Sequence, residues 1–141
     1  MKTGAPAVLQ AGSDGREISN SVTSPKLSVL LVSYNMQREA PRTIASALPP
    51  YQKRVSASDY EVLVLDNGSK QPLPKAYIAG LPANVRYLPV PDPNGSPGNA
   101  LNWGARQARA EKLMFCIDGA RILSNGLVSS AIDNLDRFPD A

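Results

Sequence analysis

The chain has 141 residues, of which 43% are hydrophobic, which suffices for one domain with a hydrophobic core. Its 15 basic and 12 acidic residues leave a net charge of +3, and no basic run is dense enough to indicate nucleic-acid binding. Histidine is absent, which excludes Ser-His-Asp and Cys-His nucleophiles and histidine-based zinc sites. Any acid–base chemistry must therefore use carboxylates, lysines or tyrosines.

The distribution of apolar residues along the chain indicates in which compartment the protein is located. No segment approaches the roughly 20 apolar residues of a transmembrane helix, and residues 5–9 are too short and proline-broken for a signal sequence. We expect a cytoplasmic protein, with the inner face of the membrane as the alternative location. Cys116 lies in an apolar run, which predicts a reduced, unreactive core thiol. Residues 1–25 are rich in Gly, Ser, Ala and Thr without periodicity and are predicted to be a disordered leader.

Ordered structure is expected from Lys26 onward, where apolar, β-branched runs alternate with helical spacing. The expected elements, in chain order, are strand 27–33, helix 38–48, strand 60–65, a weak helix 75–80, strand 85–88, a proline-rich loop 89–98, helix 99–110, strand 113–117 and a final helix from about Ser124. Such alternation predicts an α/β fold, a Rossmann-like parallel sheet with flanking helices and right-handed crossovers.

If the strand order is 3-2-1-4, the first and fourth strands are neighbours. This order would bring residues 33–35 opposite Asp118, with Asp66 and Asn67 one strand further along. Ligands of open α/β sheets bind at the carboxyl ends of the strands. These polar residues are therefore the candidate site.

The stretch LMFCIDGAR at residues 113–121 is the strongest single signal. Its uninterrupted apolar run predicts a strand buried on both faces. Asp118 follows this run and is the leading functional candidate. The helix after it is expected to be capped by Ser124 and to bury Leu127, Val128, Ala131, Ile132 and Leu135.

Three known phosphate sites do not fit. The chain has no GxxxxGK[ST] stretch, and Gly95 with Gly98 neither forms GxGxxG nor follows the first strand. A phospho-acceptor at Asp66 would need an acidic pair after the first strand, where residues 33–35 read Ser-Tyr-Asn.

Three motifs together resemble the family 2 glycosyltransferases, which have the GT-A fold. SVLLVSYN is similar to their opening strand, YEVLVLDNGS to their second strand and its turn, and GNALNWGARQARAEKLMFCIDGA to the helix and strand that lead to their Asp-x-Asp. The resemblance covers residues 26–137. It implies the N-terminal half of a GT-A fold, a nucleotide-diphosphate sugar as ligand and a role in polysaccharide biosynthesis.

Carried over position by position, the resemblance implies a nucleotide-binding set of Ser33, Tyr34, Asn35, Asp66, Asn67 and Asn102. Two alternatives remain open. Residues 66–69 are also typical of a plain turn without a ligand. Gly104 of the Asn-x-Gly match either lies beside the diphosphate or merely allows the helix to pack closely against the sheet. Trp103 is expected to cover part of the core rather than to stack on a base.

Asp118 matches the first acid of the family's Asp-x-Asp, so the resemblance implies that it holds Mg²⁺ or Mn²⁺ against the diphosphate. Ala120 departs from the pattern, since the family has a second carboxylate there. One carboxylate with phosphate oxygens and water can still hold Mg²⁺. Arg121 either offsets phosphate charge or is a solvated surface arginine.

In the family, the acceptor site and the catalytic base follow this strand, whereas the sequence ends one helix later, at Ala141. We therefore expect residues 26–141 to be a truncated donor-binding domain, with a second domain or chain supplying the acceptor site, and we assign no catalytic base. The strand at 113–117 would then form an exposed sheet edge. The expected function is sugar transfer to an acceptor hydroxyl; the alternatives are a non-catalytic nucleotide-binding module or a degenerate transferase fragment.

Overall fold

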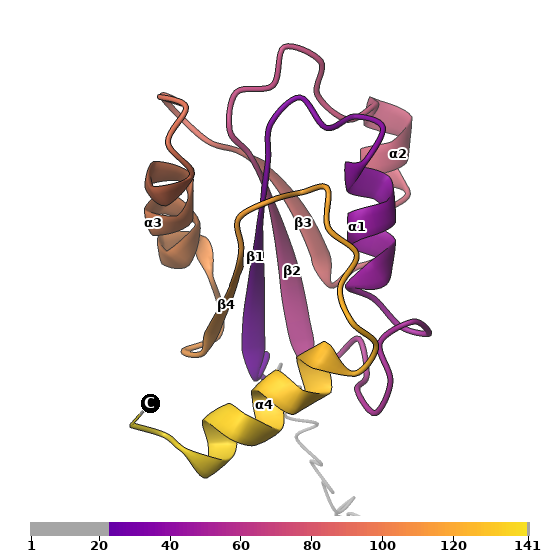
Figure 1. The fold of residues 1–141 in the computed structure, drawn as a ribbon, viewed down its shortest axis with the longest axis vertical. Helices are drawn as coiled ribbons and strands as arrows, with labels where there is room; N and C mark the ends of the chain where they lie inside the picture. The colour runs from indigo at the N-terminus through magenta and orange to yellow at the C-terminus, as the bar shows by residue number, and fades with distance from the viewer. Residues whose placement is uncertain (1–22, 141) are drawn as a thin grey trace, which may run out of the picture.

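The computed structural model describes residues 23–140, so most of the predicted leader lies outside it. Four strands alternate with four helices in these residues (Figure 1). In chain order they are β1 (Leu27–Ser33), α1 (Ala40–Ser46), β2 (Tyr60–Asp66), α2 (Lys75–Ala79), β3 (Val85–Pro89), α3 (Pro97–Gln107), β4 (Leu113–Cys116) and α4 (Leu127–Arg137). None of the helices between residues 23 and 140 is long and apolar enough to span a membrane.

The four strands form one parallel sheet in the order β3-β2-β1-β4, which confirms the predicted topology. Leu31 of β1 lies opposite Val64 of β2 on one side and Cys116 of β4 on the other. All four strands therefore end at the same edge of the sheet. This register is what brings the polar strand ends together.

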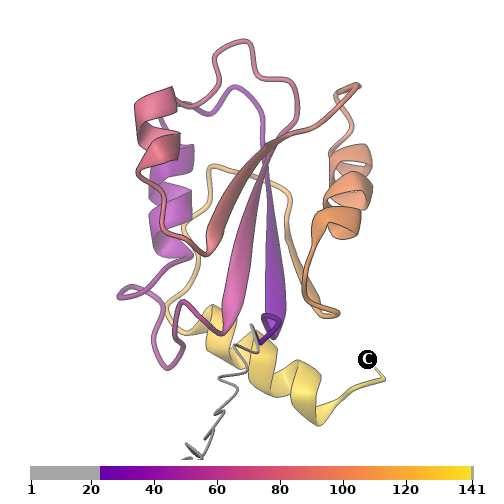
Figure 2. The same ribbon diagram turned by 180° about the vertical axis from the view of Figure 1, so that it is seen from behind.

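Helices cover both faces of the sheet, with α3 on one face and α1 and α2 on the other (Figures 1 and 2). Helix α4 crosses the end where the strands begin. Successive side chains of a strand point to opposite faces. In β1, Val29 and Leu31 accordingly join the core under α1, whereas Leu30 and Val32 join the core under α3. The apolar runs of β1 and β2 are fully buried because both strands are internal.

The prediction that residues 113–117 are buried on both faces is wrong. β4 is an edge strand of the described sheet, and the side chains of Phe115 and Ile117 are 55% and 62% exposed. The separate expectation of an exposed sheet edge is confirmed. Cys116 is half-buried rather than a core residue. Its partial burial still raises the pKa of the thiol, in the direction expected of an unreactive cysteine.

The predicted cap of the last helix is also wrong. α4 begins after Gly126, whose φ of 79° only glycine adopts without strain, and no side chain of the described residues 23–140 caps the helix. Ser124 contributes its backbone carbonyl, which accepts the Leu127 N–H. Leu127 is 39% exposed, whereas Val128 is buried as predicted. The prediction that Leu127 is buried is therefore wrong.

Helix α3 begins two residues earlier than predicted. Ser96 accepts a hydrogen bond from the Asn99 N–H with its side chain, and Pro97 occupies the first turn. Both are favourable at a helix start, since the cap satisfies a free N–H and proline lacks one. The helix ends at Gln107 instead of residue 110.

A buried carboxylate fixes the far end of α3. Glu61 of β2 is 4% exposed and accepts hydrogen bonds from the Ser28 hydroxyl (2.7 Å), the Arg86 guanidinium (3.1 Å) and the Arg109 backbone N–H (2.7 Å). A buried charge is tolerated only when it is paired and hydrogen-bonded in this way. The network ties the segment after α3 to β1, β2 and β3.

Candidate functional site

The loops after β1 and β2 meet at the carboxyl edge of the sheet. The Asn67 N–H donates to the Ser33 carbonyl over 2.9 Å, which continues the strand pairing by one residue. The Asn35 N–H donates to Ser69 Oγ at 2.8 Å, and the Lys70 N–H donates to Asn35 Oδ1 at 2.7 Å. The structure thus brings the predicted residues of both loops together.

Asn35 has a φ of 52°, the left-handed region that asparagine tolerates better than most residues. This conformation turns the chain sharply after β1. The neighbouring Tyr34 is 48% exposed, so its ring is accessible at the strand ends, whereas Ser33 is buried.

The fold uses both carboxylate oxygens of Asp66. Oδ1 accepts the Ser69 N–H at 2.8 Å, which closes the Asp-Asn-Gly-Ser turn, and Oδ2 accepts the Tyr87 hydroxyl proton. Burial, together with the hydrogen bond to Asp66, raises the pKa of Tyr87. These bonds favour the turn interpretation for Asp66 itself. The sequence analysis missed Tyr87, whose only signal was its place in the β3 run.

Asn67 lies deeper than expected. It is 4% exposed, its side-chain amide donates to the Ser96 carbonyl at 3.4 Å, and its Oδ1 has no hydrogen-bond partner within residues 23–140. Gly68, with a φ of 85°, lets the loop before α3 pack closely, because a Cβ there would lie 2.6 Å from Pro93 Cγ. Asn67 therefore joins the β2 turn to the start of α3.

Asn102 is exposed in the middle of α3, and no hydrogen bond joins it to the other predicted site residues within the described chain. Gly104 is buried against the sheet. A Cβ at this position would lie 2.4 Å from Leu65 Cδ1 and 3.2 Å from Leu30 Cδ2. This geometry favours the packing interpretation of Gly104. Trp103 is half-buried against the same core, as predicted.

Asp118 lies two residues beyond β4. Its Oδ1 accepts the Ala120 N–H at 2.9 Å, and its Oδ2 lies 3.0 Å from Arg121 Nε. The Asp118 side chain is 39% exposed and that of Arg121 is 75% exposed. Such a solvated ion pair contributes little to stability, so the arginine can move away when a ligand offers a better partner.

The residues around Asp118 could hold a metal ion only if the bound ligand supplied some of the coordinating oxygen atoms. No group of three or more Cys, Asp or Glu side chains suited to a metal lies within residues 23–140. A protein-made metal cage is therefore not present in this part of the chain. One carboxylate together with diphosphate oxygens and water satisfies the octahedral preference of Mg²⁺.

Helix α1 holds the Asp118 loop in place. Thr43 Oγ1 donates to the Gly119 carbonyl at 2.7 Å, and Ser46 Oγ accepts the Leu123 N–H at 3.0 Å. Gly119 lies directly against β1, since a Cβ there would be 3.0 Å from the Val32 carbonyl oxygen. The loop is thereby pinned beside the end of β1.

Gln52 completes this anchor. It is 2% exposed, and its side-chain amide donates to the carbonyls of Ser46 (2.7 Å) and Ser124 (3.0 Å). Its Oε1 accepts the Val128 N–H at 3.2 Å. The sequence analysis missed Thr43, Ser46 and Gln52 because most of their partners lie more than 70 residues away along the chain.

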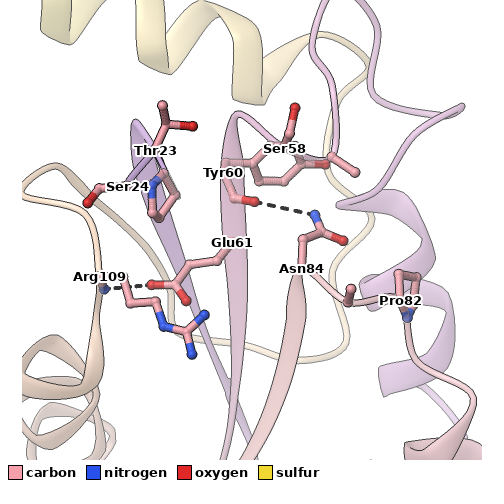
Figure 3. A pocket seen from close by; sticks show the side chains of 11 residues that line it. Thr23, Ser24, Ser58, Tyr60, Glu61, Pro82, Asn84 and Arg109 are labelled. Carbon is pink, nitrogen blue, oxygen red and sulfur yellow. Dashed lines mark hydrogen bonds between the residues drawn. The ribbon is translucent and has the colours of Figure 1, made fainter. Parts of the chain in front are cut away.

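A cavity of about 880 Å³ lies at the opposite end of the sheet, where the strands begin (Figure 3). It is lined by Thr23, Ser24, Pro25, Ala57, Ser58, Tyr60, Glu61, Pro82, Ala83, Asn84 and Arg109. Its one buried carboxylate, Glu61, is already fully hydrogen-bonded. We therefore locate the candidate site by its chemistry, at the carboxyl ends of the strands.

Comparisons with known proteins identify the family and the fold of the chain. The model of the family described as "Glycosyl transferase family 2" matches residues 28–140. The chain belongs to glycosyltransferase family 2. A search of curated proteins finds no match for it.

This family 2 chain is also similar to solved structures of TarS from S. aureus. TarS 1-349 in complex with UDP-GlcNAc has a TM-score of 0.67 at 21% identity, covering 81% of this chain and 32% of that one. The complex of TarS 1-349 with UDP has a TM-score of 0.66 at 22% identity, covering 81% and 33%. The fold is thus the N-terminal part of a GT-A fold, and the chain spans about a third of these TarS structures.

Proposed function

We propose that this chain is the donor-binding part of a glycosyltransferase, which binds a nucleotide-diphosphate sugar for transfer to an acceptor hydroxyl. The observation that carries the proposal is the convergence of three polar loops, after β1, β2 and β4, at one edge of the sheet. The complexes of TarS with UDP and with UDP-GlcNAc support a nucleotide sugar as ligand.

Within this proposal the accessible Tyr34 ring and the Asn35 turn line the nucleotide pocket. Asn67 remains a predicted contact for the base or ribose; its Oδ1 is buried in the structure, so contact with a ligand requires the β2 turn to shift. Asp66 acts mainly by holding the turn, because its oxygens are already occupied. Asn102 remains a predicted contact on the exposed face of α3.

Asp118 would hold Mg²⁺ or Mn²⁺ together with the diphosphate. A metal ion bound there would supply positive charge that stabilises the departing nucleotide diphosphate. Arg121 would leave its ion pair with Asp118 and bind a phosphate oxygen, because a guanidinium recognises phosphate well. The loop anchors at Thr43 and Gln52 would keep the carboxylate in place during this exchange.

The acceptor site and the catalytic base would come from a second domain or chain. Ala120, in place of the second acid, favours a second candidate function, a nucleotide-binding module without transfer. The two functions differ in whether the bound sugar nucleotide is cleaved.

The test is calorimetric titration with UDP, GDP and dTDP, with and without Mn²⁺. We expect one nucleotide to bind, and Asp118→Asn to weaken Mn²⁺-dependent binding by at least about tenfold because the metal loses its protein carboxylate. In the absence of Mn²⁺, Asp118→Asn and the wild type should bind the nucleotide with nearly the same affinity. Asp133→Asn, which removes an exposed acid from α4, is the matched control and should leave binding unchanged.

Each proposal has an outcome that contradicts it. If no nucleotide binds under either condition, both the transferase and the binding module are excluded. If Asp118→Asn binds as the wild type does with Mn²⁺, the metal role is wrong. Release of free nucleotide from a bound sugar nucleotide, with an added acceptor or water, distinguishes the transferase from the module.

A further inference from the structure

Helix α1 contacts two loops of the candidate site. The chain between β4 and α4 passes from the strand ends to α1 and runs along this helix (Figures 1 and 2). At the start of α1, the Met36 carbonyl accepts the N–H groups of Glu39 (3.2 Å) and Ala40 (2.8 Å), which fixes the end of the loop after β1. Further along the helix, Thr43 Oγ1 donates to the Gly119 carbonyl of the loop after β4. The same helix therefore holds both loops.

Gly119 brings the loop after β4 into close contact with the end of β1 and the loop that follows it. Gly119 is buried, and a Cβ on it would lie 3.0 Å from the Val32 carbonyl oxygen, 3.1 Å from Met36 Sδ and 3.3 Å from Ser33 Cβ. Because β1 is an internal strand of a close-packed sheet, its backbone cannot move aside for a side chain. Asp118 directly precedes Gly119, so this contact determines where its carboxylate lies relative to the loop after β1.

The Thr43 hydroxyl fixes the backbone next to Asp118. Thr43 is fully buried, and its 2.7 Å bond to the Gly119 carbonyl joins residues that are 76 positions apart. If a buried carbonyl loses such a partner, no water replaces it, so the bond is costly to break. The Ala120 N–H in turn holds Asp118 Oδ1 at 2.9 Å. The carboxylate therefore has a defined position and direction before any ligand arrives.

We propose that the contact between Thr43 and Gly119 makes the site selective for nucleoside diphosphates over monophosphates, an inference that rests on the proposed function. In that function the nucleoside lies against the loop after β1, and the diphosphate shares a metal ion with Asp118. A diphosphate thus joins the two loops. A monophosphate has fewer oxygens to share with that ion and depends mainly on the loop after β1. Thr43 is then a positioning residue, because it acts through Gly119 and Asp118.

Preorganisation is the physical reason for this selectivity. When two loops already have the separation that a ligand needs, binding does not have to order them. Without the Thr43 hydrogen bond, the backbone at Asp118 samples other positions, and a ligand that joins both loops loses affinity. Ala120 stands where the family has a second acid, so this position offers no carboxylate to replace a displaced Asp118.

Calorimetric titration with Mn²⁺ tests the inference, using whichever of UDP, GDP and dTDP binds and the corresponding monophosphate. Thr43→Val removes the hydroxyl and keeps the branched shape. It should weaken diphosphate binding by about three- to tenfold, the contribution of one hydrogen bond, and leave monophosphate binding at the wild-type value. Thr43→Ser keeps a hydroxyl and should restore the wild-type selectivity. Gly119→Ala displaces the same backbone and should also weaken diphosphate binding selectively.

A double-mutant cycle with Asp118→Asn measures whether Thr43 acts through the carboxylate. In the Asp118→Asn chain the metal ion has lost its protein carboxylate, so the addition of Thr43→Val should cause no further loss of diphosphate affinity. Ser129→Ala is the matched control. It removes another buried hydroxyl that donates to a glycine carbonyl, that of Gly126 at 2.9 Å, and should keep the wild-type selectivity.

Several results would overturn the positioning role. Thr43→Val that binds both nucleotides as the wild type does, or that loses affinity for both equally, excludes it. Additive losses in the double variant show that Thr43 does not act through Asp118. A wild type that binds no nucleotide contradicts the proposed function as well, whereas these other results leave that function intact. Circular dichroism checks the fold of each variant; if Thr43→Val unfolds, Gly119→Ala alone decides.

Discussion

Tyr60 shows at the scale of one residue how burial sets chemistry. Its side chain is 1% exposed, and its hydroxyl donates to the Ala47 carbonyl at 2.6 Å. Burial raises the pKa of Tyr60 to about 12, from an ordinary value of 10.0. The phenol therefore stays neutral in the folded protein at a pH where the unfolded chain ionises.

A pH dependence of stability follows from this shift. Below about pH 10 the neutral phenol contributes in full, and the contribution is lost as pH rises from 10 towards 12, because the unfolded state then binds fewer protons. We expect the loss to reach roughly 2–3 kcal/mol of unfolding free energy. Urea unfolding at several pH values should show a steep decline for the wild type and a shallower one for Tyr60→Phe.

The comparison rests on slopes, because Tyr60→Phe also leaves the Ala47 carbonyl without its partner and is less stable at every pH. Tyr51→Phe, at a tyrosine that is 40% exposed, is the control and should keep the wild-type slope. Equal slopes for Tyr60→Phe and the wild type would show that this phenol does not cause the decline.

Helix α3 illustrates the scale of one element. It packs on β1 and β2 through its two buried residues, Ala100 and Gly104. The absence of a side chain at Gly104 lets the helix approach Leu65, since a Cβ would lie 2.4 Å from a leucine methyl group. The close approach in turn sets where the start of α3 lies, beside Asn67 of the candidate site.

Gly104→Ala should therefore destabilise the protein. Alanine favours helix by about 1 kcal/mol over glycine, but overpacking the core costs roughly 1–3 kcal/mol, so we expect a net loss of up to about 2 kcal/mol. Gly98→Ala lies in the same helix, where a Cβ meets only Ser96 Oγ at 3.5 Å. It should be neutral or slightly stabilising. Urea unfolding of both variants measures the difference; equal stabilities would mean that the helix–sheet contact is loose.

At the scale of the whole molecule, Gln52 joins parts of the chain that are distant in sequence. Its three hydrogen bonds link the end of α1 to the Asp118 loop and to the first turn of α4. Buried carbonyl and N–H groups that lose such partners are costly because no water replaces them. The Gln52 side chain thus connects the candidate site to α4, which crosses the end of the sheet where the strands begin.

We expect Gln52→Ala to lower the free energy of unfolding by roughly 2–4 kcal/mol, since three buried backbone groups lose their partner. Amide hydrogen exchange should accelerate most at Val128 in the first turn of α4, whose N–H donates to Gln52 Oε1. Gln37→Ala, which removes an exposed glutamine bonded to the Pro72 carbonyl, is the control and should cost little. Unchanged exchange at Val128 in Gln52→Ala would contradict the anchoring role.

Much of the fold could be predicted from local pattern. The runs at β1 and β2 and the alternation of strands with helices determined the parallel sheet and its order, because apolar periodicity and right-handed crossovers leave few topologies. The polar strand ends Asn35, Asp66 and Asp118 could be recognised from their positions alone. Helix boundaries were less accurate, as Ser124 shows, because the glycine turn at Gly126 outweighed a side-chain cap.

Tertiary structure alone decided how these residues are used. Whether the apolar run of β4 is buried depends on a neighbouring strand that the run itself cannot specify, and Phe115 is exposed for that reason. Asp66 accepts a hydrogen bond from the Tyr87 hydroxyl and is therefore not free. Hydrogen bonds with Thr43 and Gln52, which are distant in sequence, fix the Asp118 loop and the start of the helix that follows it. Local sequence thus determined which chemistry lies at the strand ends, and only packing decided which groups are free to bind.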